Sequence, residues 1–144
     1  MVILFSGRKS AVEKEIIEIL TGYGANYISD KAVSSVDGSF TVVSEYKKTD
    51  IKLKSGIAVF IDDTDRFCNQ IFPDGIIGIC EDKNTAALKA FKTSGTAVIS
   101  CGMSAKNTVT LSSFGDTSLL ASLQRTLTDF EGNCIDLYRK GLCH

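Results

Sequence analysis

Short apolar runs alternate along this chain with segments of helical spacing. Four of the runs are unbroken, and they occupy residues 2–5, 57–61, 76–80 and 97–101. Runs of this length suit strands that are buried on both faces, which indicates a parallel sheet covered by helices. In such sheets, ligands bind at the carboxyl ends of the strands. The pattern therefore predicts the class of fold and the edge of the sheet where a ligand would bind.

Two of the intervening segments predict helices, over residues 11–21 and 84–93. The apolar stripe of the first helix consists of Val12, Ile16, Ile17, Ile19 and Leu20. Glu13 belongs to the charged residues around this stripe, and its spacing from Ser10 is that of a capping box. Gly22 and Gly24 end this helix. The second helix joins runs 76–80 and 97–101 into a compact βαβ unit with the usual right-handed crossover.

The remaining segments are shorter or ambiguous. Residues 27–29, 40–46 and 108–113 are expected to be strands, and Asp37-Gly38 predicts a turn. Residues 51–54 fit either an edge strand or an extended connection. Residues 119–127 fit a helix by the spacing of their leucines, but 131–133 has the character of a hairpin tip between 126–130 and 134–138. A β-ribbon near the C-terminus is the preferred interpretation.

Together these elements predict a single α/β domain over residues 1–144, a Rossmann-like fold. Its mostly parallel sheet is flanked by helices on both faces and followed by the C-terminal β-ribbon. The length is typical of one domain, and 44% hydrophobic and 23% charged residues are typical of a soluble globular protein. No apolar stretch approaches the ~18 residues of a membrane helix, and no signal peptide is expected. Five cysteines without CxxC spacing fit a reducing cytoplasm.

Charge and histidine content narrow the classes of function. A net charge of −1 and a pI near 5.8 argue against nucleic acid as the main partner. The sole histidine is His144, the last residue, so a Ser-His-Asp or Cys-His arrangement is poorly supported. A structural zinc site of the usual kind is equally disfavoured. An enzyme is therefore less expected than a binding protein.

The segment after the first apolar run is a candidate phosphate site. Gly7, Arg8, Lys9 and Ser10 lie between a predicted strand and a predicted helix N-terminus. Free backbone N–H groups and the helix dipole favour an anion there, and Arg8 and Lys9 add positive charge. The spacing differs from the Gly-x-x-x-x-Gly-Lys-Ser/Thr pattern, so fewer amides are available to wrap a phosphate. The alternative is an ordinary loop leading into a capped helix.

An acidic segment follows the run 57–61. Asp62, Asp63 and Asp65 could hold Mg²⁺, which prefers carboxylate oxygens. Asp63-Thr64-Asp65 also resembles the DxDxT nucleophile loop of haloacid-dehalogenase-type phosphatases, although Phe67 stands where that loop has its threonine. The alternative is a solvated acidic loop.

Residues 78–133 resemble the late central domain of the ATP-dependent Mur peptide ligases of cell-wall synthesis. The likeness lies in the order of features: a strand ending in Cys80-Glu81-Asp82, a helix, a strand ending in Cys101-Gly102, an alternating strand and a β-ribbon. The ligases have an Asn-x-Asp pattern where Cys80 replaces the asparagine, and their phosphate loop is missing here. The resemblance implies that Asp82 and Gly102 lie by the adenine end of a nucleotide. It also implies a relative without ligase activity, which keeps a pocket for a nucleotide or UDP-sugar, or keeps only the scaffold.

The leading hypothesis is a small cytoplasmic, non-catalytic binding module for an anionic small molecule, such as a nucleotide or nucleotide-linked metabolite. Gly7, Arg8, Lys9 and Ser10 would hold phosphate, and Asp82 and Gly102 would line the adjacent pocket. Mg²⁺ would accompany the nucleotide on Asp62, Asp63 and Asp65. One alternative is a Mg²⁺-dependent phosphotransfer or phosphohydrolase enzyme that uses Asp63 and Asp65. Another is a module for a protein partner or homo-oligomer, because the alternating C-terminal ribbon could add strands to another sheet.

Overall fold

The computed structural model describes residues 1–6, 11–34, 37–44, 52–61, 70–114, 118–135 and 139–143. The chain divides into two compact units. Unit 1 comprises Met1–Cys80 and Asn84–Val98, and unit 2 comprises Glu81–Lys83 and Ile99–His144. The expectation of one domain over residues 1–144 stays a prediction.

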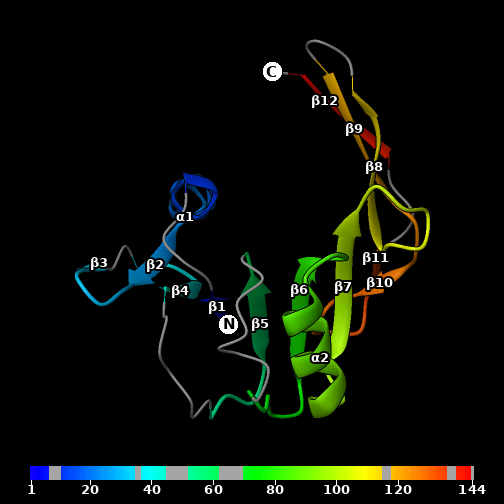
Figure 1. Ribbon diagram of the computed structural model, residues 1–144. Coiled ribbons are helices and arrows are strands. Elements are labelled where there is room, and N and C mark those ends of the chain that lie inside the picture. The colour runs from blue at the N-terminus through cyan, green and yellow to red at the C-terminus, as the bar shows by residue number, and fades with distance from the viewer. Residues whose placement is uncertain are drawn as a thin grey trace. The chain divides into compact units, whose positions relative to one another are not determined.

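Unit 1 is built on a mostly parallel sheet. Its strands are β1 (Val2–Ser6), β2 (Ala25–Ile28), β3 (Val33–Ser34), β4 (Phe40–Ser44), β5 (Gly56–Phe60) and β6 (Ile76–Glu81), the last residue of β6 belonging to unit 2. They lie in the order β6-β5-β1-β4-β2-β3, and β1 runs between β4 and β5 (Figure 1). The pairs β1–β4, β1–β5, β2–β4 and β5–β6 are parallel, and β2–β3 is antiparallel. The expected parallel sheet is therefore present.

The two helices of unit 1 cover opposite faces of this sheet. They are α1 (Ala11–Gly22) and α2 (Thr85–Ser94). The core beside α1 consists of Ile3, Phe5, Ala25 and Val42. The core beside α2 consists of Ala58, Phe60, Phe72, Ile76, Cys80, Ala87, Ala90 and Phe91. Ala58 pairs with Leu4, so it faces away from Ile3 and Phe5, because successive residues of a strand alternate between faces. Helices on both faces are thus confirmed for this unit.

The buried face of α1 differs from the expected stripe. Ile16, Ile17 and Leu20 pack against the sheet, whereas Val12 and Ile19 are both 54% exposed. Glu13 completes the inward face and is only 3% exposed. The positions 13, 16, 17 and 20 have the spacing of one helix face, so a carboxylate occupies the first core position.

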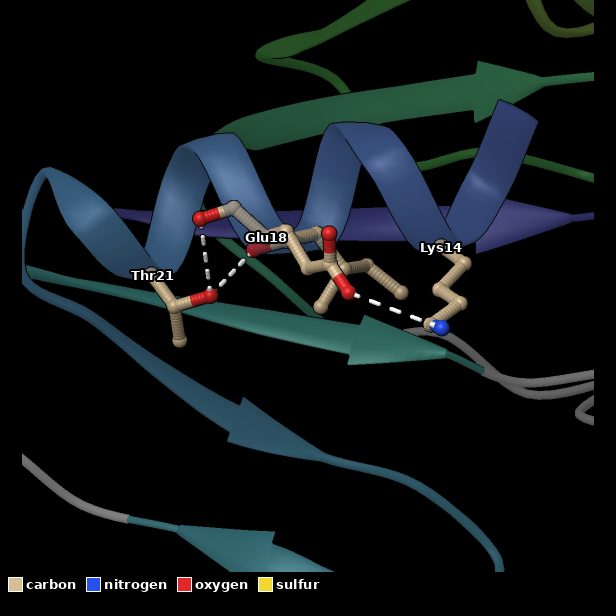
Figure 2. Close-up of polar contacts among 4 residues, drawn as sticks. Lys14, Glu18 and Thr21 are labelled. Atoms are coloured by element: carbon tan, nitrogen blue, oxygen red, sulfur yellow. Dashed lines mark hydrogen bonds and ion pairs between the residues drawn. The ribbon is translucent and has the colours of Figure 1, made fainter. Parts of the chain in front are cut away.

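The outer face of α1 carries polar contacts beside the exposed Val12 and Ile19. Figure 2 shows Lys14 pointing toward Glu18, with 3.7 Å between Nζ and Oε1. The Thr21 hydroxyl donates to the carbonyl oxygens of Ile17 and Glu18 (Figure 2). The helix ends at Gly22, as expected, and Gly24 follows with a φ of 82°. Both side chains of the ion pair are largely exposed, so their contribution to stability is small, about 0.3–0.5 kcal/mol.

Helix α2 begins at a side-chain cap and packs closely on β6. The Asn84 side chain accepts a hydrogen bond from the Ala87 N–H at 2.9 Å, and Gly95 ends the helix with a φ of 67°. Phe91 lies directly over Gly78 of β6, where an added Cβ would come 2.6 Å from the ring. The ring of Phe91 also meets Phe60 edge-on, with 5.1 Å between centroids. The absence of a side chain at Gly78 therefore makes room for the aromatic core.

Unit 2 is a β structure in the residues that the structure describes. Its strands are the end of β7 (Ala97–Gly102), β8 (Val109–Phe114), β9 (Ser118–Leu123) and β12 (Arg139–Cys143), together with the separate hairpin of β10 (Leu127–Thr128) and β11 (Cys134–Ile135). Strands β7 and β8 are parallel, while β8–β9 and β9–β12 are antiparallel. A register shift between Leu111 and Ser113 interrupts the β8–β9 ladder.

The C-terminal expectations are confirmed in part. The ribbon exists around the expected tip, with β10 and β11 paired at Leu127–Thr128 and Cys134–Ile135, and residues 136–138 lie outside the described chain. The helical alternative for residues 119–127 is wrong, because β9 occupies Ser118–Leu123. Its backbone pairs with β8 on one side and β12 on the other, and this pairing outweighs the helical spacing of the leucines. Neither helix of the described chain is long and apolar enough to cross a membrane.

Candidate functional site

Three parallel strands of unit 1 end side by side. Ser6 at the end of β1 is the register partner of Phe60 at the end of β5. On the other side of β1, Phe5 is the partner of Ser44, the last residue of β4. Neighbouring strands in a sheet are about 4.8 Å apart. The chain segments that leave β1 and β5 therefore start from adjacent points on the sheet.

The connections of β1 and β5 leave in opposite directions. From β1 the chain passes through α1 to β2, which lies on the β4 side of the sheet. From β5 it passes to β6, which lies on the other side. The change of direction between two neighbouring parallel strands defines a topological switch point, the position where ligands bind in open α/β sheets.

Both sequence-predicted loops are attached at this point. Gly7, Arg8, Lys9 and Ser10 follow Ser6 directly, and Asp62, Asp63 and Asp65 follow Ile61. These seven residues lie outside the part of the chain that the structure describes. The strand order brings the two starting points together, which sequence alone leaves open. Lys9 and Asp63 stay predicted site residues.

A buried polar pair lies beside the end of β1. The Ser44 hydroxyl donates a hydrogen bond to Oε1 of Glu13 at 2.5 Å. Ser44 is 1% exposed and Glu13 is 3% exposed, so both groups are removed from water. A carboxylate is costly to bury, and it is retained where hydrogen bonds or nearby positive groups offset the cost. Sequence analysis missed this pair, although a glutamate in phase with Ile16, Ile17 and Leu20 was the available signal.

A second polar cluster lies in unit 2, at the end of β7. Asn107 Nδ2 donates to Oδ2 of Asp82 at 2.7 Å, and the Asp82 N–H donates to the Cys101 carbonyl at 2.9 Å. An added Cβ on Gly102 would come 2.6 Å from both Asp82 Oδ2 and Asn107 Nδ2. The structure therefore brings Asp82 and Gly102 into contact, with Asn107 as a partner that the sequence did not reveal.

The pKa of the Cys101 thiol depends on the same cluster. Burial raises the pKa of Cys101 above its usual value, and the negative charge of Asp82 raises it further. A raised pKa lowers the thiolate fraction at neutral pH, so this thiol is a poor nucleophile. Cys101 and Cys134 form no disulfide.

The described residues were compared with the grouping of side chains that a metal ion requires. Among residues 1–6, 11–34, 37–44 and the later described ranges, no three histidine, cysteine, aspartate or glutamate side chains group as metal ligands. Asp62, Asp63 and Asp65 lie outside those ranges.

Comparison with known protein families finds no family model that matches this chain, and no curated protein matches it significantly.

Proposed function

We propose that unit 1 binds an anionic small molecule, a nucleotide or nucleotide-linked metabolite, at the carboxyl ends of β1 and β5. The observation that carries this proposal is the parallel pairing of β1 with β5, from which the chain leaves in opposite directions. Helices on opposite faces of the sheet support a Rossmann-like, doubly wound arrangement. The phosphate-binding groups in this proposal are Gly7, Arg8, Lys9 and Ser10.

Mg²⁺ is the cofactor that this proposal includes, held by Asp62, Asp63 and Asp65. The carboxylates follow β5, and the basic residues follow its neighbour β1. Mg²⁺ binds through one or two carboxylates together with the phosphates of a substrate. Opposite charges on segments that leave neighbouring strand ends fit a metal–nucleotide complex better than a bare phosphate.

A thermal-shift screen against nucleotides, UDP-sugars and inorganic phosphate, with and without Mg²⁺, tests the proposal. A ligand at a hundredfold excess over its Kd stabilises the folded state by about 2.7 kcal/mol, which raises the Tm by several degrees. Lys9→Ala should then weaken binding roughly tenfold or more, because a hydrogen bond to a charged group contributes about 1.5–3 kcal/mol.

Lys54→Ala and Asp74→Asn serve as matched controls. Both side chains are exposed and lie just before β5 and β6, at the amino ends of the strands. They change charge by the same amount as Lys9→Ala and Asp63→Asn, but at the opposite edge of the sheet. The proposal fails if no ligand shifts the Tm, or if the controls weaken binding as much as the site variants do.

The second candidate is a Mg²⁺-dependent phosphohydrolase or phosphotransferase that uses Asp63 and Asp65. It is supported by the place of the acidic segment in the sequence, after β5, whose neighbour β1 precedes the segment that would hold phosphate. Phosphate release from nucleotides or aryl phosphates would require Mg²⁺ and would be lost in Asp63→Asn. Turnover that survives this substitution would reject the candidate.

The resemblance to Mur ligases leads to a separate proposal for unit 2. Asp82 and Gly102 would lie at the adenine end of a nucleotide. Their contact with each other supports the proposal that they belong to one binding site. Asp82→Asn should weaken adenosine binding, with Asp74→Asn, at an exposed position before β6, as the control. We also propose that the protein is cytoplasmic, because the absence of CxxC spacing among its five cysteines fits a reducing compartment.

A further inference from the structure

We propose that unit 1 binds a helix of another protein beside α1, on the face of the sheet that α1 covers only in part. The partner helix is amphipathic, with a broad apolar face toward unit 1 and basic residues along its border with α1. This surface uses no residue of the two candidate loop segments, so the inference does not depend on the proposed function.

A second apolar stripe runs along α1, next to the face that packs on the sheet. Val12 and Ile19 are each 54% exposed, and Tyr23, just after the end of α1, is 80% exposed. The half-buried Ile16 lies between them, so the four residues are spaced by four, three and four positions. This is the spacing of the seam between two packed helices. The stripe is therefore suited to contact with a helix.

The stripe lies on the side of α1 that is nearer β5. Figure 2 shows Lys14, Glu18 and Thr21 on the side of the helix toward β4, and β5 lies beyond β1 on the other side. Val12 precedes Lys14 by two positions, which places their side chains on opposite sides of a helix with 3.6 residues per turn. The stripe thus borders the part of the sheet that β5 and β6 form.

Strands β5 and β6 present an apolar surface on this face. Ile57 and Val59 of β5 pair with Ile77 and Ile79 of β6, and all four side chains are half-buried. The β5 residues contact the core beside α1, whereas the two β6 residues belong to neither core of unit 1. Of the two helices that the structure describes, α2 covers the opposite face, and α1 packs mainly on β1, β2 and β4. No described helix therefore covers β6 on the α1 face.

A helix is the element that fits both surfaces at once. Parallel strands are normally covered by helices on both faces. Strand β6 is two strands from β1, which is roughly 10 Å at a spacing of about 4.8 Å. Packed helices have interaxial distances of about 8–10 Å, so a helix over β6 would also contact the exposed stripe of α1.

The occupant is a different protein rather than a second copy of this chain. Helix α2 uses its apolar face on its own sheet. The free stripe of α1 is narrow, so it could meet the same stripe of a second copy but could not cover β6 as well. A partner helix with a broad apolar face satisfies both requirements.

Exposed carboxylates define the charge of the partner. Glu15 follows Val12 by three positions and precedes Ile19 by four, so it adjoins both on the helix surface. Glu15 is exposed and forms no ion pair within the part of the chain that the structure describes. Lysine or arginine side chains on the partner helix would therefore find an acidic border beside the apolar stripe.

A synthetic peptide of about 21 residues serves as the probe, because shorter isolated helices are marginal in water. It carries leucines over one broad face and lysines elsewhere, and a second peptide has glutamates in place of the lysines. Fluorescence anisotropy measures their binding to the full chain. We expect saturable binding of the lysine peptide and roughly fivefold weaker binding of the glutamate peptide, since exposed ion pairs contribute modestly. No saturable binding of the lysine peptide, or equal binding of both, overturns the inference.

Ile19→Ser tests the apolar stripe. It should raise the Kd of the lysine peptide roughly tenfold, because the side chain is exposed in the free protein and would be buried in the complex. Ile71→Ser is the matched control, since Ile71 is 70% exposed in the segment that contacts α2. Equal effects of the two substitutions overturn the inference. If Ile19→Ser does not fold, as judged by circular dichroism, Tyr23→Ser decides by the same comparison.

Glu15→Lys tests the acidic border, with Asp74→Lys as the control for charge at another exposed position. Glu15→Lys should weaken the lysine peptide and strengthen the glutamate peptide, whereas Asp74→Lys should change neither. An equal response to both substitutions overturns the inference. Sedimentation of the free protein excludes the remaining occupant: a dimer that Ile19→Ser dissociates would show that a second copy covers the stripe, and it would overturn the inference as well.

Discussion

Asp129 shows how one side chain organises a turn. Its Oδ1 accepts the N–H groups of Glu131 and Asn133, and its Oδ2 accepts the side-chain amide of Asn133. These bonds favour the ionised form, so the pKa of Asp129 is lower than usual, with the Asn133 side chain as the largest cause. The tip of the β10–β11 hairpin is therefore ordered by hydrogen bonds to one carboxylate.

This lowered pKa predicts a measurable change in Asn133→Ala. Carboxyl carbon shifts followed by NMR should give Asp129 a midpoint below the ordinary aspartate value, and the substitution should raise it. Because the folded-state pKa is the lower one, the stabilisation is complete above the unfolded-state pKa and disappears as pH falls through the folded one. An unchanged midpoint in Asn133→Ala would contradict the assignment of the main cause.

Cys101 gives a second prediction at the scale of a residue. In a background with Cys68, Cys134 and Cys143 changed to serine, Cys101 should react with iodoacetamide more slowly than a free cysteine at pH 8, because its pKa is raised. Asp82→Asn should increase the rate modestly, since burial is the larger cause and remains. Asp74→Asn is the control for charge, and an equal increase there would contradict the role of Asp82.

Single residues also show which features of α1 the hydrophobic pattern could not predict. The helix over residues 11–21 was predictable from its apolar spacing, but the choice of inward face was not, because Val12 and Ile19 extend the apparent stripe. The sheet selects the face that includes Glu13, and Ser44 makes this possible by donating to its carboxylate. Ser44 is 31 positions away from Glu13 in the sequence, so the residues around Glu13 could not predict this hydrogen bond.

At the scale of the element, the packing of α2 depends on a glycine in the neighbouring strand β6. Gly78→Ala would place a methyl group 2.6 Å from the Phe91 ring, closer than contacts in cores allow. We expect the free energy of unfolding to fall by about 1–3 kcal/mol, as for other overpacked cores, measured by urea denaturation. Combining Gly78→Ala with Phe91→Leu should cost less than the sum of the two single changes. Strict additivity would show that the two positions do not compete for space.

The elements differ in how far sequence predicts them. Continuous apolar runs predicted β1, β5, β6 and β7, although no residue of β7 is fully buried. Strand β9 could not be assigned, since its leucines fit a helix as well as a strand. Its partners β8 and β12 supply the backbone hydrogen bonds that decide between the two.

At the scale of the whole molecule, the order of the strands determines which chain segments start side by side at the ligand-binding edge of the sheet. The sequence indicates which edge of a parallel sheet would bind a ligand, but not which strands are neighbours there. Long-range pairing places β5 beside β1, although α1, β2, β3 and β4 lie between them in the sequence. This order unites the starting points of the basic and acidic segments, and it is the basis of the proposed function.

The central claim concerns the location of the ligand, and amide chemical-shift mapping tests it most directly. A labelled sample would be titrated with ADP and Mg²⁺ while the backbone amides of unit 1 are followed. The account predicts that Ser6, Ala11, Ser44 and Ile61 shift in a saturable way, whereas Gly56 and Ile76 at the amino ends of their strands do not. Saturable shifts confined to Gly56, Ile76 or the β10–β11 hairpin, or no shifts at all, would contradict it.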